Sequence, residues 1–343
     1  MKALWLFRKP RDLGNFSIEY SFREMERAWP NPSPPQWHEV KQLSNGLWNR
    51  IKIIREAQGL KADIIHITGD IYFCAFAFRR LIRQKGSVKK KKPQIVATIH
   101  DIGYIHHPSP FKRKLIKYLW FTGPLKRIDH LVVVSQATKN DVVQEATWFP
   151  AEKITVIPTV VPQHFKPRKK QPNNPKPVAL HIGLAENKNL KGHAEALGGM
   201  DVHLKIIGEP SLSDLALLEK HDIDFSWQSK LTDEEMQEAY AASDFLLFAS
   251  TLEGFGMPII EAQMVGLPVI TSDVNPMREV AGDAALLCDP YDTNSIRASI
   301  EEVIGNPAKQ ENLIQKGFVN CNKYAPATSA AMLNEFYESL LNP

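Results

Sequence analysis

Short apolar segments alternate with segments of helical periodicity along nearly all of the 343-residue chain, and the pattern starts twice. The first run begins with a predicted strand at residues 3–7, and the second begins with a predicted strand at residues 178–182. Residues 162–177 are rich in Pro, Asn and Lys, lack hydrophobic periodicity and are predicted to be a linker. Because strands that alternate with helices form parallel sheets covered on both faces, we expect two doubly wound α/β domains facing each other across a cleft.

The two halves of the chain carry opposite charge. Residues 1–165 contain 27 Lys and Arg against 13 Asp and Glu, whereas residues 166–343 contain 15 against 25. The net charge of +4 therefore combines a basic half with an acidic half, which indicates two domains with different partners. No base-stacking or groove-reading motif accompanies the basic half, so nucleic acid is not expected as a partner.

Three features bear on the cellular compartment. The hydrophobic fraction of 43% allows sizeable cores, but no apolar run is long enough to span a bilayer. The N-terminal segment has only a short apolar run and no small-residue cleavage site, so we interpret it as a strand and not as a signal peptide. Cys74, Cys288 and Cys321 are scattered and lack metal-ligand spacing, which is typical of reduced thiols. These features together predict a cytoplasmic location.

A glycine-rich loop within residues 250–268 lies between a predicted strand and a predicted helix and carries two carboxylates. The apolar run 245–249 indicates a buried strand, and Pro258 stands where the helix would start. Glu253 then lies in the loop and Glu261 in the first turns of the helix. Free N–H groups at a helix N-terminus favour phosphate, while carboxylates suit hydroxyl groups, so the stretch predicts a nucleotide-sugar site. The alternative is an ordinary strand–loop–helix unit with two solvated glutamates.

The sequence E-G-F-G-M-P-I-I-E at residues 253–261 is an E-x7-E pattern. Its flanks read A-A-S-D-F-L-L-F-A-S before it, then G-L-P-V-I-T-S and E-V-A-G-D-A-A-L-L-C-D-P-Y-D after it. This region resembles the retaining GT-B glycosyltransferases of family 4 (glycosyl transferases group 1). The resemblance implies two Rossmann-like domains: an N-terminal acceptor-side domain at residues 1–165, joined by a returning C-terminal helix at 328–343, and a C-terminal donor-binding domain at 166–327.

The resemblance also implies a reaction and a donor site. A member of this family moves a sugar from a nucleotide-diphosphate sugar to an acceptor hydroxyl with retention of the anomeric configuration, and neither a metal nor another cofactor is expected. Glu261 would bind the ribose hydroxyls, and Glu253 would hydrogen-bond the sugar hydroxyls. The backbone N–H groups of Gly254, Phe255 and Gly256 would support the sugar and the phosphate.

The turn after the strand at residues 178–182 usually supplies an Arg and a Lys to the donor diphosphate in this family. Lys188 matches the Lys and would neutralise the leaving diphosphate. The Arg is missing, because Leu184 and Asn187 occupy the nearby positions. Lys191 is the nearest basic residue that could substitute, although a solvated helix lysine is the other interpretation of it. A lysine alone lacks the bidentate fork of an arginine.

Candidate ligands of the donor sugar or the acceptor in the first half follow predicted strands, where open α/β sheets place ligands. They are Gly14, Asp70, His100, Asp101 and Ser135. The resemblance implies that His100 contacts the donor sugar during catalysis, and it places Ser135 in a V-S-x-x-T pattern near the cleft. Three of the five have a structural alternative: Gly14 as an ordinary turn glycine, and Asp70 and Ser135 as helix N-caps.

Two basic segments of the first half, Lys89–Lys92 and Phe111–Phe121, favour an anionic membrane surface as a partner. In the second segment Arg113, Lys114 and Lys117 share one helical face, with aromatic residues interleaved. Basic amphipathic segments of this kind lie on anionic membranes, so we expect peripheral contact with the inner face of a membrane and a sugar or lipid-linked acceptor. The alternatives are a solvated basic loop and a helix packed on its own sheet.

The sequence therefore predicts a retaining hexosyltransferase-type glycosyltransferase of cell-surface polysaccharide or glycolipid assembly. Asp222 and Asp224 form a D-x-D pattern, which holds a metal in the other large glycosyltransferase fold, but here it begins a predicted strand and no metal site is expected. Two alternatives stay open. One is a GT-B sugar-nucleotide 2-epimerase, and the other is a non-catalytic sugar-nucleotide-binding or membrane scaffold protein, which the missing Arg would suit.

Overall fold

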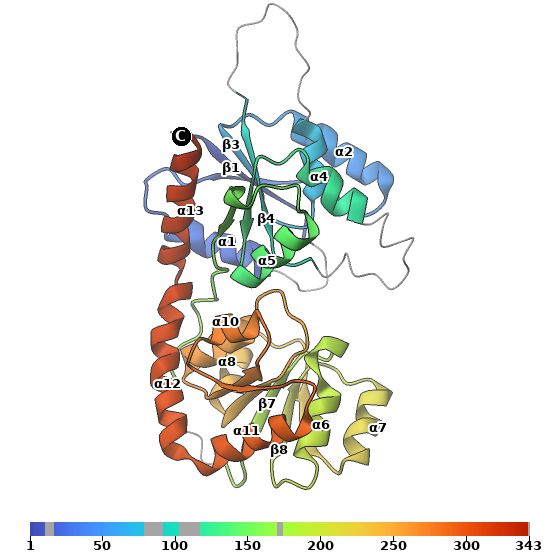
Figure 1. Ribbon diagram of the computed structural model, residues 1–343, viewed down its shortest axis with the longest axis vertical. Helices are drawn as coiled ribbons and strands as arrows, with labels where there is room; N and C mark the ends of the chain where they lie inside the picture. Colours follow the sequence, from blue (N-terminus) through green and yellow to red (C-terminus); the bar gives the residue numbers. More distant parts are fainter. Residues whose placement is uncertain (11–16, 79–91, 103–116, 170–173, 342–343) are drawn as a thin grey trace, which may run out of the picture. The chain divides into compact units, whose positions relative to one another are not determined.

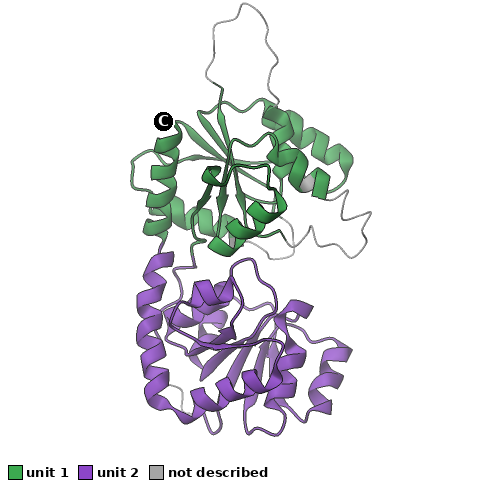
Figure 2. Ribbon diagram, in the orientation of Figure 1, with its two compact units in different colours: residues 1–160, 326–343 green, residues 161–325 purple. Residues whose placement is uncertain are grey.

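The computed structural model describes residues 1–10, 17–78, 92–102, 117–169 and 174–341. The chain forms two compact units, coloured separately in Figure 2. Unit 1 comprises residues 1–160 and 326–343, and unit 2 comprises residues 161–325. Among the predicted features, Gly14, residues 89–91 of the basic run Lys89–Lys92, and residues 111–116 lie outside the described residues.

Unit 1 is built on a six-stranded sheet in which all neighbouring strands are parallel, in the order β2-β1-β3-β4-β5-β6. Its strands are β1 (Ala3–Phe7), β2 (Gln36–Glu39), β3 (Ile64–Ile67), β4 (Gln94–Ile99), β5 (His130–Val133) and β6 (Ile154–Val156). The central strands β1 and β3 are buried along their whole length, as expected where both faces of a parallel sheet are covered.

Helices cover both faces of this sheet (Figure 1). They are α1 (Ser17–Arg27), α2 (Leu47–Gln58), η1 (Tyr72–Phe78), η3 (Lys117–Thr122), α4 (Gly123–Leu125), α5 (Gln136–Glu145), η4 (Ala151–Lys153) and α13 (Pro326–Leu341). One core joins α1 and α13 to the sheet, and a second core lies under α2, η1 and α4. Figure 1 shows α2 and α4 on the side of the sheet away from α13.

A buried chain of hydrogen bonds ties the C-terminal helix α13 to the sheet of unit 1. The Trp5 indole donates to the Tyr337 hydroxyl over 2.8 Å, and that hydroxyl lies against Nδ1 of His66. His66 Nε2 then reaches the Thr98 hydroxyl over 2.7 Å. Burial, with a smaller contribution from His100, lowers the pKa of His66 to about 3, so this core histidine is neutral.

Unit 2 repeats the plan with the strand order β12-β11-β10-β7-β8-β9, again with every pairing parallel. Its strands are β7 (Val178–Ile182), β8 (His203–Ile207), β9 (Asp224–Gln228), β10 (Phe245–Phe248), β11 (Val269–Ser272) and β12 (Leu286–Cys288). Its helices are η5 (Glu186–Lys188), α6 (Leu190–Leu197), α7 (Leu212–Lys220), α8 (Asp233–Ala241), α9 (Met257–Val265), α10 (Met277–Ala281), α11 (Thr293–Gly305), α12 (Pro307–Cys321) and η6 (Asn322–Tyr324).

The structure differs from the predicted elements in two places. After Asp70, which was interpreted as a possible helix N-cap, the structure has a 3-10 helix at residues 72–78 and not an α-helix. The first part of the expected linker packs onto unit 2 instead of standing free: Phe165 is 5% exposed, and the Arg168 guanidinium donates to the Ser243 carbonyl over 2.8 Å. The linker composition gave no sign of this packing, because its partners are distant in sequence.

None of the helices in the described residues has both the length and the apolar character that crossing a bilayer requires.

Candidate active site

The predicted donor-site residues of unit 2 gather where the strand order reverses, between β7 and β10. Chains leave these two neighbouring strands in opposite directions, and open α/β sheets bind ligands in the crevice that results. Lys188 follows β7, and Glu253 follows β10. The ammonium group of Lys188 lies 2.6 Å from Oε1 of Glu253, and the two side chains are only 21% and 12% exposed.

Asparagine side chains fasten the two loops of this site to each other. The Asn187 side chain donates to the Leu252 carbonyl over 2.7 Å, and the Asn187 carbonyl accepts the N–H of Thr251 over 2.8 Å. Asn189, in the left-handed conformation at the N-cap of α6, donates to the carbonyls of Ala249 and Pro290. The loop after β7 and the loop after β10 are therefore positioned as one unit before any ligand arrives.

Two further contacts hold the Lys188 side chain. Its ammonium group lies 5.0 Å from the centre of the Phe248 ring, within the range of a cation–π contact. Its methylene carbons run over Gly183, where a Cβ atom would come within 3.2 Å of Cε. Gly183 has φ +84°, so both the backbone conformation and the space favour glycine here.

One of the two residues near the place of the expected arginine, Leu184, makes an apolar contact. Leu184 packs onto Gly208 in the turn after β8. Lys191 does not replace the missing charge, because its side chain is 76% exposed and its ammonium group lies 3.9 Å from Glu195 on its own helix. Lys188 is thus the basic side chain that the described structure places beside Glu253.

The glycine-rich loop leads directly into the N-terminus of α9. Gly256 is the N-cap with φ +97°, and Pro258 occupies the first turn. Phe255 is 7% exposed and packs edge-on against Tyr324, so its side chain belongs to the core. Gly254 and Phe255 can contribute to a site through their backbone N–H groups, beside the free N–H groups that begin α9.

Glu261 lies one turn further along α9 and is partly accessible. Its Oε2 accepts a hydrogen bond of 2.6 Å from the hydroxyl of Tyr240 on α8. Burial raises the pKa of Glu261 to about 7, the Tyr240 hydrogen bond opposes that rise, and the negative charge of Asp233 adds to it. The carboxyl group is therefore poised to change its charge near neutral pH.

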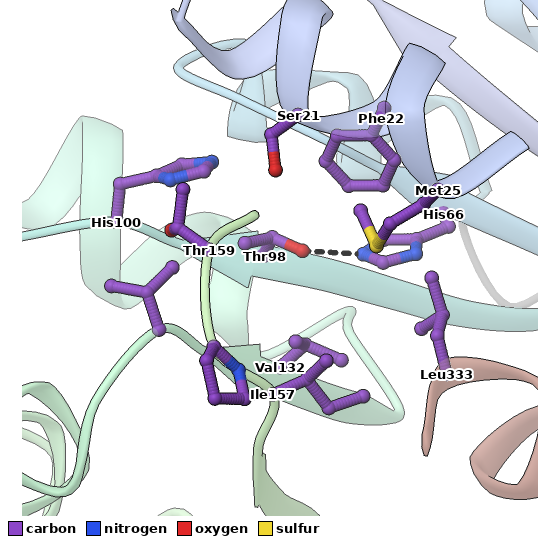
Figure 3. Close-up of a pocket in the computed structure, with 12 residues that line it drawn as sticks. Ser21, Phe22, Met25, His66, Thr98, His100, Val132, Ile157, Thr159 and Leu333 are labelled. Carbon is purple, nitrogen blue, oxygen red and sulfur yellow. Dashed lines mark hydrogen bonds between the residues drawn. The ribbon is translucent and has the colours of Figure 1, made fainter. Parts of the chain in front are cut away.

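His100 occupies the corresponding carboxyl edge of the sheet in unit 1, directly after β4. Its Nε2 lies 2.9 Å from the Thr68 carbonyl, which can only accept, so Nε2 carries the proton and Nδ1 is left as an acceptor. Burial lowers the pKa of His100, against smaller opposing effects of Thr68, Asp101 and Glu19. Figure 3 shows His100 at the rim of a cavity of about 20 Å³, the size of one water molecule.

An ion-pair cluster lies near His100 in unit 1. The Arg8 guanidinium, 13% exposed, contacts Glu19 Oε1 at 3.3 Å and Asp70 Oδ2 at 3.2 Å. Asp70 thus pairs with a cation at the end of β1. Asp101, which follows His100, is exposed.

Ser135 has the capping role that was one of its two interpretations. It is the N-cap of α5, accepts the N–H of Thr138 over 3.0 Å and is 1% exposed. Its predicted contact with a substrate stays a prediction.

The two residues of the D-x-D pattern have structural roles in unit 2. Asp222 adopts φ +52° in a turn, and Asp224 begins β9, where it pairs with Lys176 and His203. A search of the described residues finds no group of His, Cys, Asp and Glu side chains arranged to hold a metal ion.

Sequence reasoning missed Arg8, Glu19 and Tyr240. Arg8 directly follows a strand, and a charged residue at that place was a usable signal. Glu19 and Tyr240 lie on helices, at positions where the sequence shows only an amphipathic pattern. Their partners are far away along the chain, so only the tertiary structure brings them to the site.

Solved structures share this architecture. Sucrose-phosphate synthase from Thermosynechococcus elongatus superposes with a TM-score of 0.73 over 100% of both chains, at 15% identity. Anabaena Alr3699/HepE, in complex with UDP and glucose, superposes with a TM-score of 0.72 over 99% of this chain and 100% of that chain, at 16% identity. These likenesses establish the class of fold, which is GT-B.

Sequence comparison then gives the family. The family described as "Glycosyl transferases group 1" matches residues 162–319, and "Glycosyltransferase Family 4" matches residues 16–164. Together the two matches run through nearly the whole chain, which belongs to the group 1 glycosyltransferases of family 4. The prediction of family and fold is therefore confirmed.

Curated relatives are similar over part of their length. O-antigen chain mannosyltransferase B of Escherichia coli is 26% identical over 67% of this chain and 66% of its own length. O-antigen chain mannosyltransferase RfbU of Salmonella typhimurium is 27% identical over 60% of each chain. The MMP alpha-(1->4)-mannosyltransferase of Mycolicibacterium hassiacum is 25% identical over 63% of this chain and 59% of its own length. The chain thus spans less than two thirds of each of these relatives.

Proposed function

We propose that this protein is a retaining hexosyltransferase that uses a nucleotide-diphosphate sugar, with mannose as the first candidate sugar, in cell-surface polysaccharide or glycolipid assembly. The observation that carries the proposal is the Lys188–Glu253 pair at the switch point of unit 2, beside the N-terminus of α9. The mannosyltransferase names of the curated relatives support the choice of sugar and of pathway.

Each donor-site residue has a role in this proposal that suits its chemistry. Lys188 and the N–H groups at the start of α9 hold the diphosphate, Glu253 accepts hydrogen bonds from sugar hydroxyls, and Glu261 accepts those of the ribose. Lys188 is already fixed by Glu253 and Phe248, so it stabilises the negative charge of the leaving diphosphate without reorganising. No metal or other cofactor is part of the proposal.

In the proposed reaction the bond from the anomeric carbon to the diphosphate oxygen breaks, and a bond to the acceptor oxygen forms on the same face of the sugar. The acceptor proton passes to the departing diphosphate. We assign His100 as a ligand of the donor sugar: its Nδ1 accepts a hydrogen bond from a sugar hydroxyl, because Nε2 donates to the Thr68 carbonyl. Asp70 and Asp101 are proposed acceptor ligands.

If the acceptor is linked to a lipid, unit 1 would have to bind an anionic membrane at its cytoplasmic face. Exposed apolar side chains of unit 1 support such a contact. Leu47 and Trp48 at the start of α2 are 70% and 77% exposed, and Tyr118 on η3 is 59% exposed. They add to the basic segments Lys89–Lys92 and Phe111–Phe121 of the sequence. Comparing the binding of the protein to anionic and to neutral vesicles tests this contact, and stronger binding to the anionic vesicles is the expected result.

The experiment that tests the proposed reaction follows the slow hydrolysis of donors by proton NMR. UDP-, GDP- and dTDP-α-hexoses are incubated with the wild-type protein, and the first free sugar is observed before it mutarotates. A retaining enzyme releases the α anomer first, together with the nucleoside diphosphate. Initial release of the β anomer would contradict retention. Release of an epimerised sugar, with or without an acceptor, would favour the 2-epimerase.

A second candidate function is non-catalytic binding of a sugar nucleotide. The specific observation in its favour is Leu184, one of the two residues near the place of the expected arginine, which packs onto Gly208. Calorimetric binding of a nucleoside diphosphate without turnover, across the donor panel and a panel of membrane-lipid acceptors, would support this candidate over the first.

A further inference from the structure

We propose that Tyr240 is a positioning residue of the donor site: its hydroxyl holds the Glu261 carboxylate in the orientation and the charge state that receive the two ribose hydroxyls of the donor. The inference rests on the proposed function, because it takes Glu261 as the ligand of the ribose hydroxyls. It adds a supporting role for Tyr240, which lies outside the E-x7-E pattern. It concerns only unit 2.

The direction of the Tyr240–Glu261 hydrogen bond is fixed. Tyr240 is completely buried, and its hydroxyl lies 2.6 Å from Oε2 of Glu261. Burial and the neighbouring carboxylate raise the pKa of Tyr240 well above its usual range, so the phenol keeps its proton and donates it. This bond engages one carboxylate oxygen, and the residue as a whole is partly accessible.

The tyrosine itself is held rigidly by the packing of α8. Its ring meets the ring of Phe165 edge-on at 5.4 Å. The Gln237 side chain, one turn earlier, forms two hydrogen bonds with the backbone of Lys166, of 2.8 and 3.1 Å. The segment that precedes the sheet of unit 2 therefore fixes where the Tyr240 hydroxyl stands.

The charges around Glu261 make this hydroxyl decisive. Burial and Asp233, at the start of α8, both disfavour the carboxylate, and Tyr240 favours it. His164 lies 3.6 Å from Asp233, whose side chain is 69% exposed. An ionised carboxylate accepts hydrogen bonds from both hydroxyls of a vicinal diol, whereas a protonated one has lost acceptor capacity. Loss of the Tyr240 donor would thus raise the pKa of Glu261 further, so that the carboxyl group would already be protonated at a higher pH.

The test compares a ribonucleoside diphosphate with its 2′-deoxy form by calorimetry between pH 6 and 9. UDP with dUDP and GDP with dGDP are used, because both members of a pair carry the same phosphates, and phosphate titration cancels in the ratio of their affinities. The variants are Tyr240→Phe, Glu261→Gln and a control, Tyr324→Phe. Tyr324 is a buried tyrosine of the same unit whose hydroxyl donates to the Val280 carbonyl.

The wild-type protein should bind the ribose form about tenfold more tightly at pH 8, with the ratio falling as the pH is lowered through 7. In Tyr240→Phe the whole curve should move to higher pH, so that the ratio approaches one at pH 7 and recovers near pH 9. Glu261→Gln should give a ratio that does not vary with pH, and Tyr324→Phe should follow the wild type.

Three outcomes would overturn the inference. They are a Tyr240→Phe curve that coincides with the wild-type curve, a Tyr240→Phe ratio lowered equally at every pH, and a wild-type ratio that is constant with pH. The last needs no variant, so the inference stays testable even if Tyr240→Phe fails to fold. Failure of the wild-type protein to bind any nucleoside diphosphate would instead contradict the proposed function itself.

Discussion

At the scale of single residues, Gly183 shows that the site depends on a position without a side chain. Its left-handed backbone and the passage of the Lys188 side chain over its Cα both disfavour a Cβ atom. Gly199 also has a left-handed backbone, with φ +73°, but nothing lies within 4 Å of its would-be Cβ. The two glycines therefore separate backbone strain from displacement of the lysine.

We expect Gly183→Ala and Gly199→Ala each to lower the free energy of unfolding by about 1 kcal/mol, because each forces an alanine into the left-handed region. Only Gly183→Ala should also weaken nucleoside diphosphate binding, by about tenfold, since it pushes Lys188 away from Glu253. Urea denaturation and calorimetry measure the two effects. Equal nucleotide affinity in the two variants would show that the contact with Gly183 does not position Lys188.

The residues of the site were partly predictable from the sequence. Glu253 and Lys188 are 65 positions apart, yet a motif and a strand end indicated both, and the structure joins them at 2.6 Å. Neither signal predicts that Glu253 and Lys188 form an ion pair with each other. Tyr240 carried no signal, because a buried tyrosine on an amphipathic helix is ordinary until its hydroxyl is found against a carboxylate.

At the scale of elements, α2 carries a feature that its packing does not explain. Ile53 and Ala57 bury one face of the helix, yet Leu47 and Trp48 at its N-terminal end are largely exposed. Exposed apolar residues in a basic half suit the interface of an anionic membrane.

The double variant Leu47→Ser, Trp48→Ala should therefore lose about tenfold in affinity for vesicles that contain anionic lipid, because the apolar area of these side chains no longer enters the interface. Trp227→Ala is the matched control: Trp227 is 45% exposed and lies on β9, in the acidic half of the chain. Vesicle co-sedimentation measures both. Equal loss in the two variants, or unchanged binding of the double variant, would count against α2 as the membrane contact.

Elements were predictable where one local signal was sufficient. Buried strands such as β1 and β10 follow apolar runs that need no knowledge of the partner strand. Thr232 and Glu235 likewise form a capping box, a local signal for the start of α8. Residues 162–169 of the predicted linker were misjudged because Phe165 is a single aromatic residue in a polar stretch, and its burial depends on Tyr240 in a distant helix. The composition of a segment describes its average polarity and flexibility, and it cannot predict a single tertiary contact such as that of Phe165 with Tyr240.

At the scale of the whole molecule, both units depend on buried neutral histidines. Burial lowers the pKa of His66 in unit 1 to about 3 and that of His181 in unit 2 to about 4. Between these values and the unfolded pKa near 6.5, the unfolded chain binds protons that the folded chain does not. Stability must therefore rise with pH up to about 6.5 and fall on acidification. Glu261, whose pKa is raised, acts in the opposite direction between about 4.5 and 7.

Because the buried histidines, among them His66, His100 and His181, oppose the one carboxyl group Glu261, we expect stability to fall between pH 6.5 and 4.5. The free energy of unfolding should decrease by a few kcal/mol in total, and the urea midpoint should decrease with it. His181→Gln should show a shallower decrease than the wild type, since it removes one of the titrating groups. Chemical denaturation at several pH values tests this, and a midpoint that stays constant over the range would contradict it.

The two-unit organisation was visible in the sequence, because the strand–helix pattern begins twice and the charge changes sign between the halves. The assignment of α13 to unit 1 was not visible in the helix itself. Its attachment depends on Tyr337 meeting Trp5 and His66, three residues whose sequence contexts are unrelated.

The central claim is that Lys188 holds the donor diphosphate at the switch point of unit 2. Its most direct test compares Lys188→Gln with Lys191→Gln, two neighbouring lysines of which only the first contacts Glu253. Release of nucleoside diphosphate from the donor that the wild-type protein cleaves is measured for both variants, with thermal melting as a check on folding. We predict that Lys188→Gln loses at least about a hundredfold in rate while Lys191→Gln keeps the wild-type rate. A folded Lys188→Gln variant with wild-type turnover would contradict the claim.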